Sequence, residues 1–107
     1  MAPIHYLVTI TPAPGKEARL REVLTNIANE VEKNEPGLLR YHFFEQYDGE
    51  KGNVFIVQET YEDEAAVAAH ANASYFIELK KILPEEGLLA APLDLKKIQP
   101  FAGFASR

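Results

Sequence analysis

The sequence contains no cysteine and no tryptophan, and only one methionine among its 107 residues. The absence of cysteine excludes a thiol nucleophile, a disulfide framework, a zinc site with thiolate ligands and an iron–sulfur cluster. It also favours a cytoplasmic location, because chains without disulfides are typical of reducing compartments. The first fifteen residues contain neither lysine nor arginine, so we expect no secretory signal peptide.

Long apolar runs and an excess of basic residues are also missing. The richest late apolar run, 88–93, is far shorter than a membrane span and contains a proline, so no membrane partner is expected. Lysine and arginine total 11 against 16 acidic residues, which gives a net charge of -5 and argues against a nucleic-acid partner. The length predicts one domain over 1–107, large enough to bury a core.

Apolar periodicity predicts an alternating set of strands and helices. Leu20, Val23, Leu24, Ile27 and Val31 recur three or four apart, which is typical of one helix face. Asp63 and Ser74 are expected to cap two later helices, and Pro84 to end the last one. The predicted strands are 4–10, 38–47, 54–61 and 93–98, and the predicted helices are 16–33, 65–70 and 75–83. This order is the α+β, ferredoxin-like βαββαβ fold with an antiparallel sheet.

Two of the predicted strands carry large residues on both faces. Val54 and Ile56 point to one side and Phe55 and Val57 to the other, and residues 38–47 alternate in the same way, with Leu38 on the same side as His42. One layer of helices covers one face only, so we expect a homodimer in which a second subunit covers the other face. Between the first helix and the second strand, Gly37 is expected to adopt a backbone conformation that a β-carbon would strain.

Several segments together resemble the antibiotic biosynthesis monooxygenase (ABM) domain family, from the first strand to the last. The segments that carry the resemblance are Glu35-Pro36-Gly37-Leu38-Leu39-Arg40-Tyr41, Gln58-Glu59-Thr60-Tyr61-Glu62-Asp63-Glu64-Ala65, Ala69-His70 and Ser74-Tyr75-Phe76. The resemblance implies a dimeric α+β barrel of two ferredoxin-like subunits. It also implies one of several activities: cofactor-free oxygenation of quinols or anthrones, haem degradation, or isomerisation. Two features weaken the haem alternative. The sequence has no tryptophan, and Lys80 and Lys81 stand in the region where the haem-degrading members have an iron-binding histidine.

The resemblance places His70 and Glu59 at family positions and so makes them candidate catalytic residues. His70 would act as a base or as a hydrogen-bond partner of the substrate, since an imidazole titrates near neutral pH. The alternative is that His70 only ties its helix to the sheet. Glu59 lies within an apolar strand, so its carboxylate must be paired there; it would orient His70 or serve structure alone.

Tyr75 is the third catalytic candidate, because its hydroxyl could bond a polar ligand. The candidate substrate-binding residues are Tyr61, Phe76 and His42. Phe76 is alternatively a core residue, and His42 alternatively lies in the contact between subunits. A metal site made of His5, His42 and Glu59 is conceivable, but no spacing of ligands requires it, and we predict none. No glycine-rich phosphate loop is present.

We therefore expect a cofactor-free monooxygenase, with dioxygen as co-substrate, acting on a small hydrophobic molecule with an acidic proton. A phenol, a quinol, an anthrone or an enolisable ketone has such a proton, and the deprotonated substrate itself would reduce dioxygen. Two alternatives stay open: an isomerase that uses the same residues for acid–base catalysis, and a non-catalytic dimer that binds a hydrophobic ligand. One fold hosts many activities, so the fold alone does not choose among them.

Overall fold

The protein is described from a computed structural model, which covers residues 2–50 and 52–107. The described residues form β1 (Ile4–Ile10), α1 (Glu17–Asn34), β2 (Leu38–Gln46), β3 (Val54–Tyr61), α2 (Glu64–Ala71), α3 (Ser74–Glu85) and β4 (Asp94–Ile98). All paired strands are antiparallel, in the order β2-β3-β1-β4. The predicted ferredoxin-like α+β fold is confirmed.

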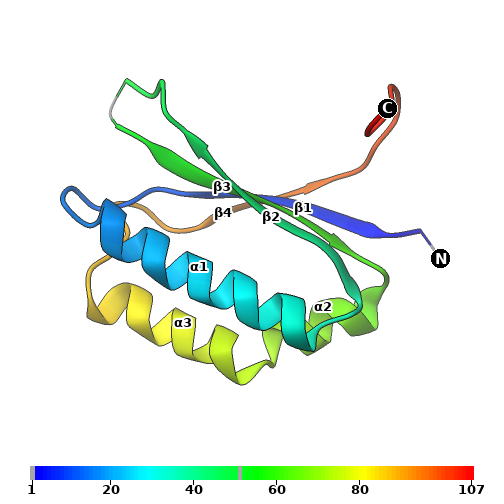
Figure 1. Ribbon diagram of the computed structural model, residues 1–107, viewed down its shortest axis with the longest axis horizontal. Helices are drawn as coiled ribbons and strands as arrows, with labels where there is room; N and C mark the ends of the chain where they lie inside the picture. Colours follow the sequence, from blue (N-terminus) through cyan, green and yellow to red (C-terminus); the bar gives the residue numbers. More distant parts are fainter. Residues whose placement is uncertain (1, 51) are drawn as a thin grey trace.

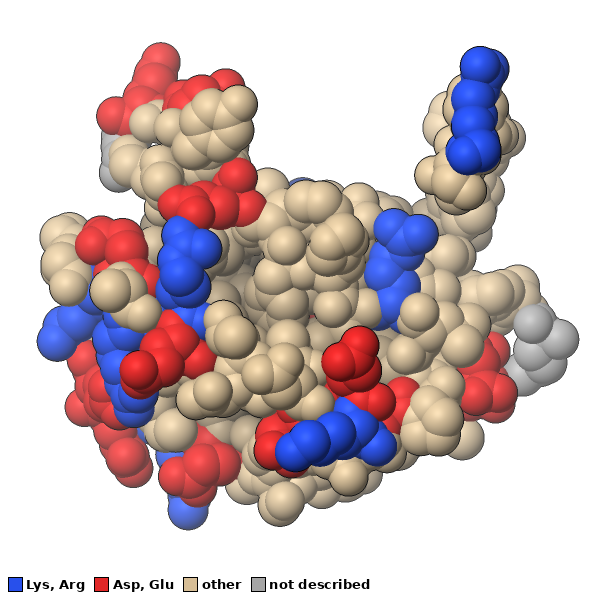
Figure 2. Space-filling model, viewed as in Figure 1, with Lys and Arg blue, Asp and Glu red and all other residues tan. Residues whose placement is uncertain are grey.

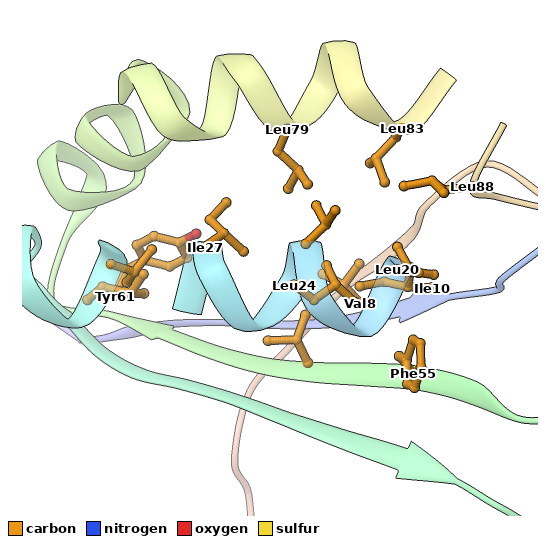
Figure 3. Close-up of a cluster of buried hydrophobic side chains, with 14 residues drawn as sticks. Val8, Ile10, Leu20, Leu24, Ile27, Phe55, Tyr61, Leu79, Leu83 and Leu88 are labelled. Carbon is orange, nitrogen blue, oxygen red and sulfur yellow. The ribbon is translucent and has the colours of Figure 1, made fainter. Parts of the chain in front are cut away.

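The three helices lie together on one face of the sheet (Figure 1). The apolar stripe predicted for α1 is buried against that face, with Leu20, Ile27 and Val31 at most 3% exposed. Side chains of β1, β3 and α3 complete the core, and Figure 3 shows them converging between the sheet and the helices. Burial of each such large apolar side chain contributes about 1.5–3 kcal/mol to folding.

The opposite face of the sheet, which we call the open face, is not covered by any helix of the described residues (Figure 1). The strand register places on it the side chains of Leu7, Phe44, Ile56 and Ile98. The segment after β4 rises away from the body of the molecule on this side, with Phe101 97% and Phe104 69% exposed. The homodimer stays a prediction that this apolar face motivates.

A β-bulge near the start of β2 corrects the predicted alternation of that strand. Leu38 pairs with Tyr61 and Arg40 with Thr60, so Leu39 is an extra residue without a partner of its own. Leu38 therefore shares the helix-covered face with Tyr41 and Phe43, whereas Arg40, His42 and Phe44 share the open face. The expected grouping of Leu38 with His42 was wrong, because a bulge shifts the two-residue period by one position.

The predicted helix caps have mixed outcomes. Asp63 accepts a hydrogen bond of 2.9 Å from the Ala66 backbone amide, as expected for the cap of α2. Ser74 is wrong as a cap, because α3 begins at this residue and Ala73 precedes it without a side-chain bond. Pro84 lies inside the last turn of α3 and does not end it.

The end of α3 is instead formed by a Schellman motif around Gly87. Gly87 has a φ of +58°, its amide bonds the Pro84 carbonyl at 3.1 Å, and the Leu88 amide bonds the Leu83 carbonyl at 3.0 Å. This pattern satisfies the last carbonyls of a helix and needs a left-handed residue, which glycine adopts without strain.

Gly37 has no positive φ, so the conformational strain expected there was wrong. Its lack of a side chain matters for a different reason. A β-carbon at this position would lie 3.0 Å from the Ala66 β-carbon and 2.9 Å from the Glu62 carboxylate. Gly37 therefore permits the turn after α1 to pack closely against α2.

Candidate functional site: a buried carboxylate, imidazole and phenol at three helix ends

His70 lies in the last turn of α2 and is only 5% exposed. Its Nδ1 atom is 3.1 Å from both carboxylate oxygens of Glu35. Because an ionised carboxylate can only accept hydrogen bonds, this geometry requires Nδ1 to carry the proton and donate it.

Glu35, the partner of His70, is the C-cap residue of α1, and its own backbone amide bonds the Val31 carbonyl. Pro36 follows it and disfavours further helical geometry, so the chain turns here and the Glu35 side chain reaches toward α2. Its side chain is only 8% exposed. A carboxylate at this depth is stable only when donors surround it.

Tyr75 supplies the second of those donors. It lies in the first turn of α3, and its phenolic hydroxyl donates a hydrogen bond to Oε2 of Glu35. Burial and the bond to the Glu35 carboxylate raise the pKa of Tyr75 well above its ordinary value. Tyr75 thus stays protonated across the physiological range and remains a donor. We call Glu35, His70 and Tyr75 the Glu35 cluster.

Glu59 and Tyr61 form a separate buried pair beneath this cluster. They are two residues apart on the helix-covered face of β3, and the Tyr61 hydroxyl donates to Oε1 of Glu59 at 2.5 Å. Burial raises the pKa of Glu59 above its ordinary value, and the Tyr61 bond and the nearby His70 only partly oppose this. Glu59 pairs with Tyr61, and the described hydrogen bonds include none from it to His70.

Aromatic rings enclose the imidazole. The ring centroid of His70 is 4.6 Å from that of Phe76, 5.4 Å from that of Tyr41 and 5.9 Å from that of Tyr61. Burial, together with the charges of Glu59 and Glu35, raises the pKa of Tyr41 well above its ordinary value. The site therefore holds two carboxylates in a largely apolar shell, where electrostatic interactions are stronger than in water.

His42 lies apart from these groups. It is on the open face of β2, where its ring stacks near Phe44 at 4.3 Å between centroids. His5 is on the same open face and bonds the Thr60 hydroxyl at 3.1 Å, whereas Glu59 faces the helices. Over residues 2–50 and 52–107 no three side chains are grouped so that they could hold a metal ion.

The residues expected to form the site thus divide into three groups. The structure brings His70, Tyr75 and Phe76 together, places Glu59 and Tyr61 next to them as a pair, and leaves His42 on the other face of the sheet. Glu35 was not predicted from the sequence to be a site residue. A carboxylate before Pro-Gly at a helix end looks like an ordinary solvated terminus, and only its bonds to His70 of α2 and Tyr75 of α3 reveal its burial.

Hollows on the surface reach the cluster at Glu35. A hollow of about 390 Å³ between the end of α1 and β2 is lined by Glu35, Leu38 and Tyr41, and another beside α2 is lined by Glu35 and Ala66. His70 lines none of the five hollows found over the described residues. Because Nδ1 already carries the proton that it donates to Glu35, a proton from a bound molecule could reach the imidazole only at its other nitrogen, Nε2.

No helix in the described part of the chain has the length and apolar character needed to cross a bilayer.

Comparison with known families yields one match, the family described as antibiotic biosynthesis monooxygenase, whose sequence model aligns with residues 3–81. No curated protein matches the chain.

Solved structures with the same fold are numerous. A protein from Pseudomonas aeruginosa superposes with a TM-score of 0.81 at 24% identity, covering 95% of this chain and 97% of its own. A candidate antibiotic biosynthesis monooxygenase from Caulobacter crescentus gives 0.81 at 25% identity, covering 94% and 91%. A protein from Mycobacterium tuberculosis gives 0.80 at 19% identity, covering 97% and 100%.

Proposed function

The chain belongs to the antibiotic biosynthesis monooxygenase family, and from this membership we propose that it is a cofactor-independent monooxygenase. Its substrate is a small hydrophobic molecule with an acidic proton: a phenol, a quinol, an anthrone or an enolisable ketone. The observation that carries the proposal is the Glu35 cluster, a proton-accepting group held by buried hydrogen bonds inside an aromatic shell. Dioxygen is the co-substrate.

The first step is removal of the acidic proton by the pair of His70 and Glu35. Glu35 holds the imidazole through Nδ1 and stabilises the positive charge that the imidazole gains when it binds a second proton. Tyr75 fixes the carboxylate from the other side, so that neither group must reorganise during the transfer. The product of this step is an electron-rich substrate anion in an apolar setting.

The second step is oxidation of that anion by dioxygen. Overall the substrate loses two hydrogen atoms and gains one oxygen atom, while the second oxygen atom leaves as water. All four electrons that dioxygen takes up come from the substrate, so no flavin, haem or metal is needed for the balance. The apolar surroundings protect the anion from water.

The remaining candidate residues have supporting roles in the proposal. Tyr61 and Phe76 pack against the imidazole and limit its rotation, and the Tyr61 hydroxyl donates a hydrogen bond to Glu59. His42 lies on the open face, which we propose is covered by the second subunit of a homodimer.

Oxygen consumption tests the proposed function. The protein is assayed with a panel of 1,4-naphthoquinols and anthrones, and we expect one dioxygen consumed for each substrate molecule above the uncatalysed rate. His5→Gln is the matched control for His70→Gln, because it makes the same substitution at a histidine on the other face of the sheet. Turnover without oxygen consumption would indicate an isomerase, and binding without turnover would indicate a ligand-binding protein; either result would overturn the proposal.

A further inference from the structure

Two hollows adjoin along the seam between α1 and the edge strand β2. The first, of about 290 Å³, is lined by Leu24, Phe43 and Phe55, and the second is the one of about 390 Å³ that Glu35 lines. Ala28 and Tyr41 line both. We call the two together the α1–β2 groove. Figure 2 shows that the middle of this face carries no charged side chains and is hollowed.

The groove exists because the helix presents a small residue where the strand presents large ones. Tyr41 and Phe43 point toward the helix layer, yet both stay partly exposed, since the facing α1 position is Ala28. Their rings meet edge to face, 5.0 Å apart at 89°. Each hollow is near the lower end of the range of about 300–1,000 Å³ for small-molecule sites.

The two ends of the groove differ in chemistry. At one end Arg21 and Glu45 form an ion pair with each other, so this end carries no net charge. At the other end lies the Glu35 carboxylate. Its two oxygens offer about four acceptor positions, of which the His70 Nδ1–H and the Tyr75 hydroxyl use only part. Glu35 can therefore accept one more hydrogen bond from a molecule in the groove.

We propose that the α1–β2 groove binds a flat aromatic molecule with an acidic hydroxyl, which it donates to Glu35, and that Ala28 sets how long that molecule can be. The class of ligand in this inference rests on the proposed function. In the inference, Glu35 is the residue of the cluster that contacts the substrate. His70 lines no part of the groove, and its Nδ1–H holds the carboxylate that the bound molecule meets.

The aromatic walls favour a planar ring, because edge-to-face and offset contacts with Tyr41 and Phe43 add to the burial of apolar surface. A side chain larger than alanine at position 28 would stand between the two hollows and separate them. The ring would then lie in the hollow lined by Phe55, beyond reach of the carboxylate.

Binding of 2-naphthol, with naphthalene as the probe that lacks the hydroxyl, tests the groove by titration calorimetry. We expect 2-naphthol to bind at least about tenfold more tightly than naphthalene, since a bond to a charged acceptor contributes about 1.5–3 kcal/mol and each 1.4 kcal/mol is tenfold. Ala28→Phe should weaken 2-naphthol binding by a similar factor. Ala18→Phe, an exposed position on the same helix, should leave the affinity unchanged.

Any one of three results would overturn the proposed groove. These are equal affinities for the two probes, no binding of 2-naphthol, and an Ala28→Phe variant that binds 2-naphthol as tightly as the parent. Glu35→Gln adds a second measurement, because this substitution should reduce the preference for 2-naphthol over naphthalene. If the Glu35→Gln variant does not fold, the comparison of the two probes in the parent still tests the groove. Probe binding needs no turnover. Binding without oxygen consumption would overturn the proposed function alone, and oxygen consumption that Ala28→Phe leaves unchanged would overturn the groove alone.

Discussion

His70 and Glu35 are 35 residues apart in the chain, and the imidazole Nδ1 of one lies 3.1 Å from both carboxylate oxygens of the other. This contact joins the end of α1 to the end of α2. It changes what removal of the histidine is expected to do. His70→Ala would leave a cavity among aromatic rings and a buried carboxylate without its donor, so loss of activity and loss of stability would be mixed.

His70→Gln separates the two effects, because a glutamine amide can donate to Glu35 but does not titrate. We expect activity to fall by about 10²–10⁴-fold, the range typical of a removed proton acceptor, while the melting temperature changes by only a few degrees. A stable His70→Gln protein with full activity would remove His70 from the mechanism.

Tyr75→Phe tests the other donor to Glu35. A hydrogen bond to a charged group contributes about 1.5–3 kcal/mol, so we expect the free energy of unfolding in urea to fall by about that amount. The loss should be much smaller in a Glu35→Gln background, because the charged acceptor is already gone. If the losses of unfolding free energy from the two substitutions are additive, the Tyr75 hydroxyl contributes nothing to stability through Glu35.

Glu59→Gln is expected to stabilise the protein at neutral pH. Burial raises the pKa of Glu59, so between the unfolded and the native pKa the native state binds more protons than the unfolded state. The free energy of unfolding therefore decreases as the pH rises through this interval. Above the interval, the whole free-energy cost of burying the charged carboxylate remains. The amide removes that cost and can still accept the Tyr61 bond.

The advantage of Glu59→Gln should vanish below the ordinary carboxyl pKa of about 4.3, where both proteins are neutral at this position. Melting temperatures between pH 3.5 and 8 measure it, with Glu85→Gln, an exposed position of α3, as the control. A variant that is less stable than the parent at pH 7 would contradict the cost ascribed to the buried charge.

Gly37→Val should destabilise the junction that carries Glu35. The added side chain must displace Ala66 on α2, where even a β-carbon would lie 3.0 Å away. Overpacking of this kind costs about 1–3 kcal/mol, measurable by urea unfolding. A variant that unfolds with the parent would show that α2 shifts freely away from the turn.

Ile56→Glu tests the predicted homodimer, since Ile56 lies on the open face of β3. An interface over this face would bury ~2,000 Å² or more, as obligate dimers do. Light scattering of the parent at micromolar concentration should give twice the chain mass, and the variant should dissociate or aggregate. Ala71→Glu, exposed on α2, is the control. A parent that is monomeric at this concentration would rule out the dimer.

Local patterns in the sequence were enough to predict most of the fold. The stripe of Leu20, Leu24 and Ile27 and the alternation in β3 follow directly from which side chains avoid water. Pro84 was misread because its effect depends on position: the last turn of α3 tolerates it, and Gly87 then ends the helix.

The candidate site was only partly predictable. His70, Tyr75 and Phe76 were found together because the resemblance named them and they are close in sequence. Glu35 was missed because its role depends on contacts between distant segments, and a glutamate at a helix end looks the same whether it is solvated or buried. The side of the sheet on which His42 lies could not be predicted without knowledge of the bulge.

That bulge determines which side chains of β2 line the groove. If Leu39 paired with Thr60 in place of Arg40, the bulge would be lost, and Arg40 and His42 would turn toward the helices and Tyr41 toward the open face. The groove would then exchange an aromatic wall for a basic one. The one unpaired residue of the bulge thus keeps the basic side chains out of the groove and the aromatic ones in it, and a deletion of Leu39 would leave every later residue of β2 facing as it does now.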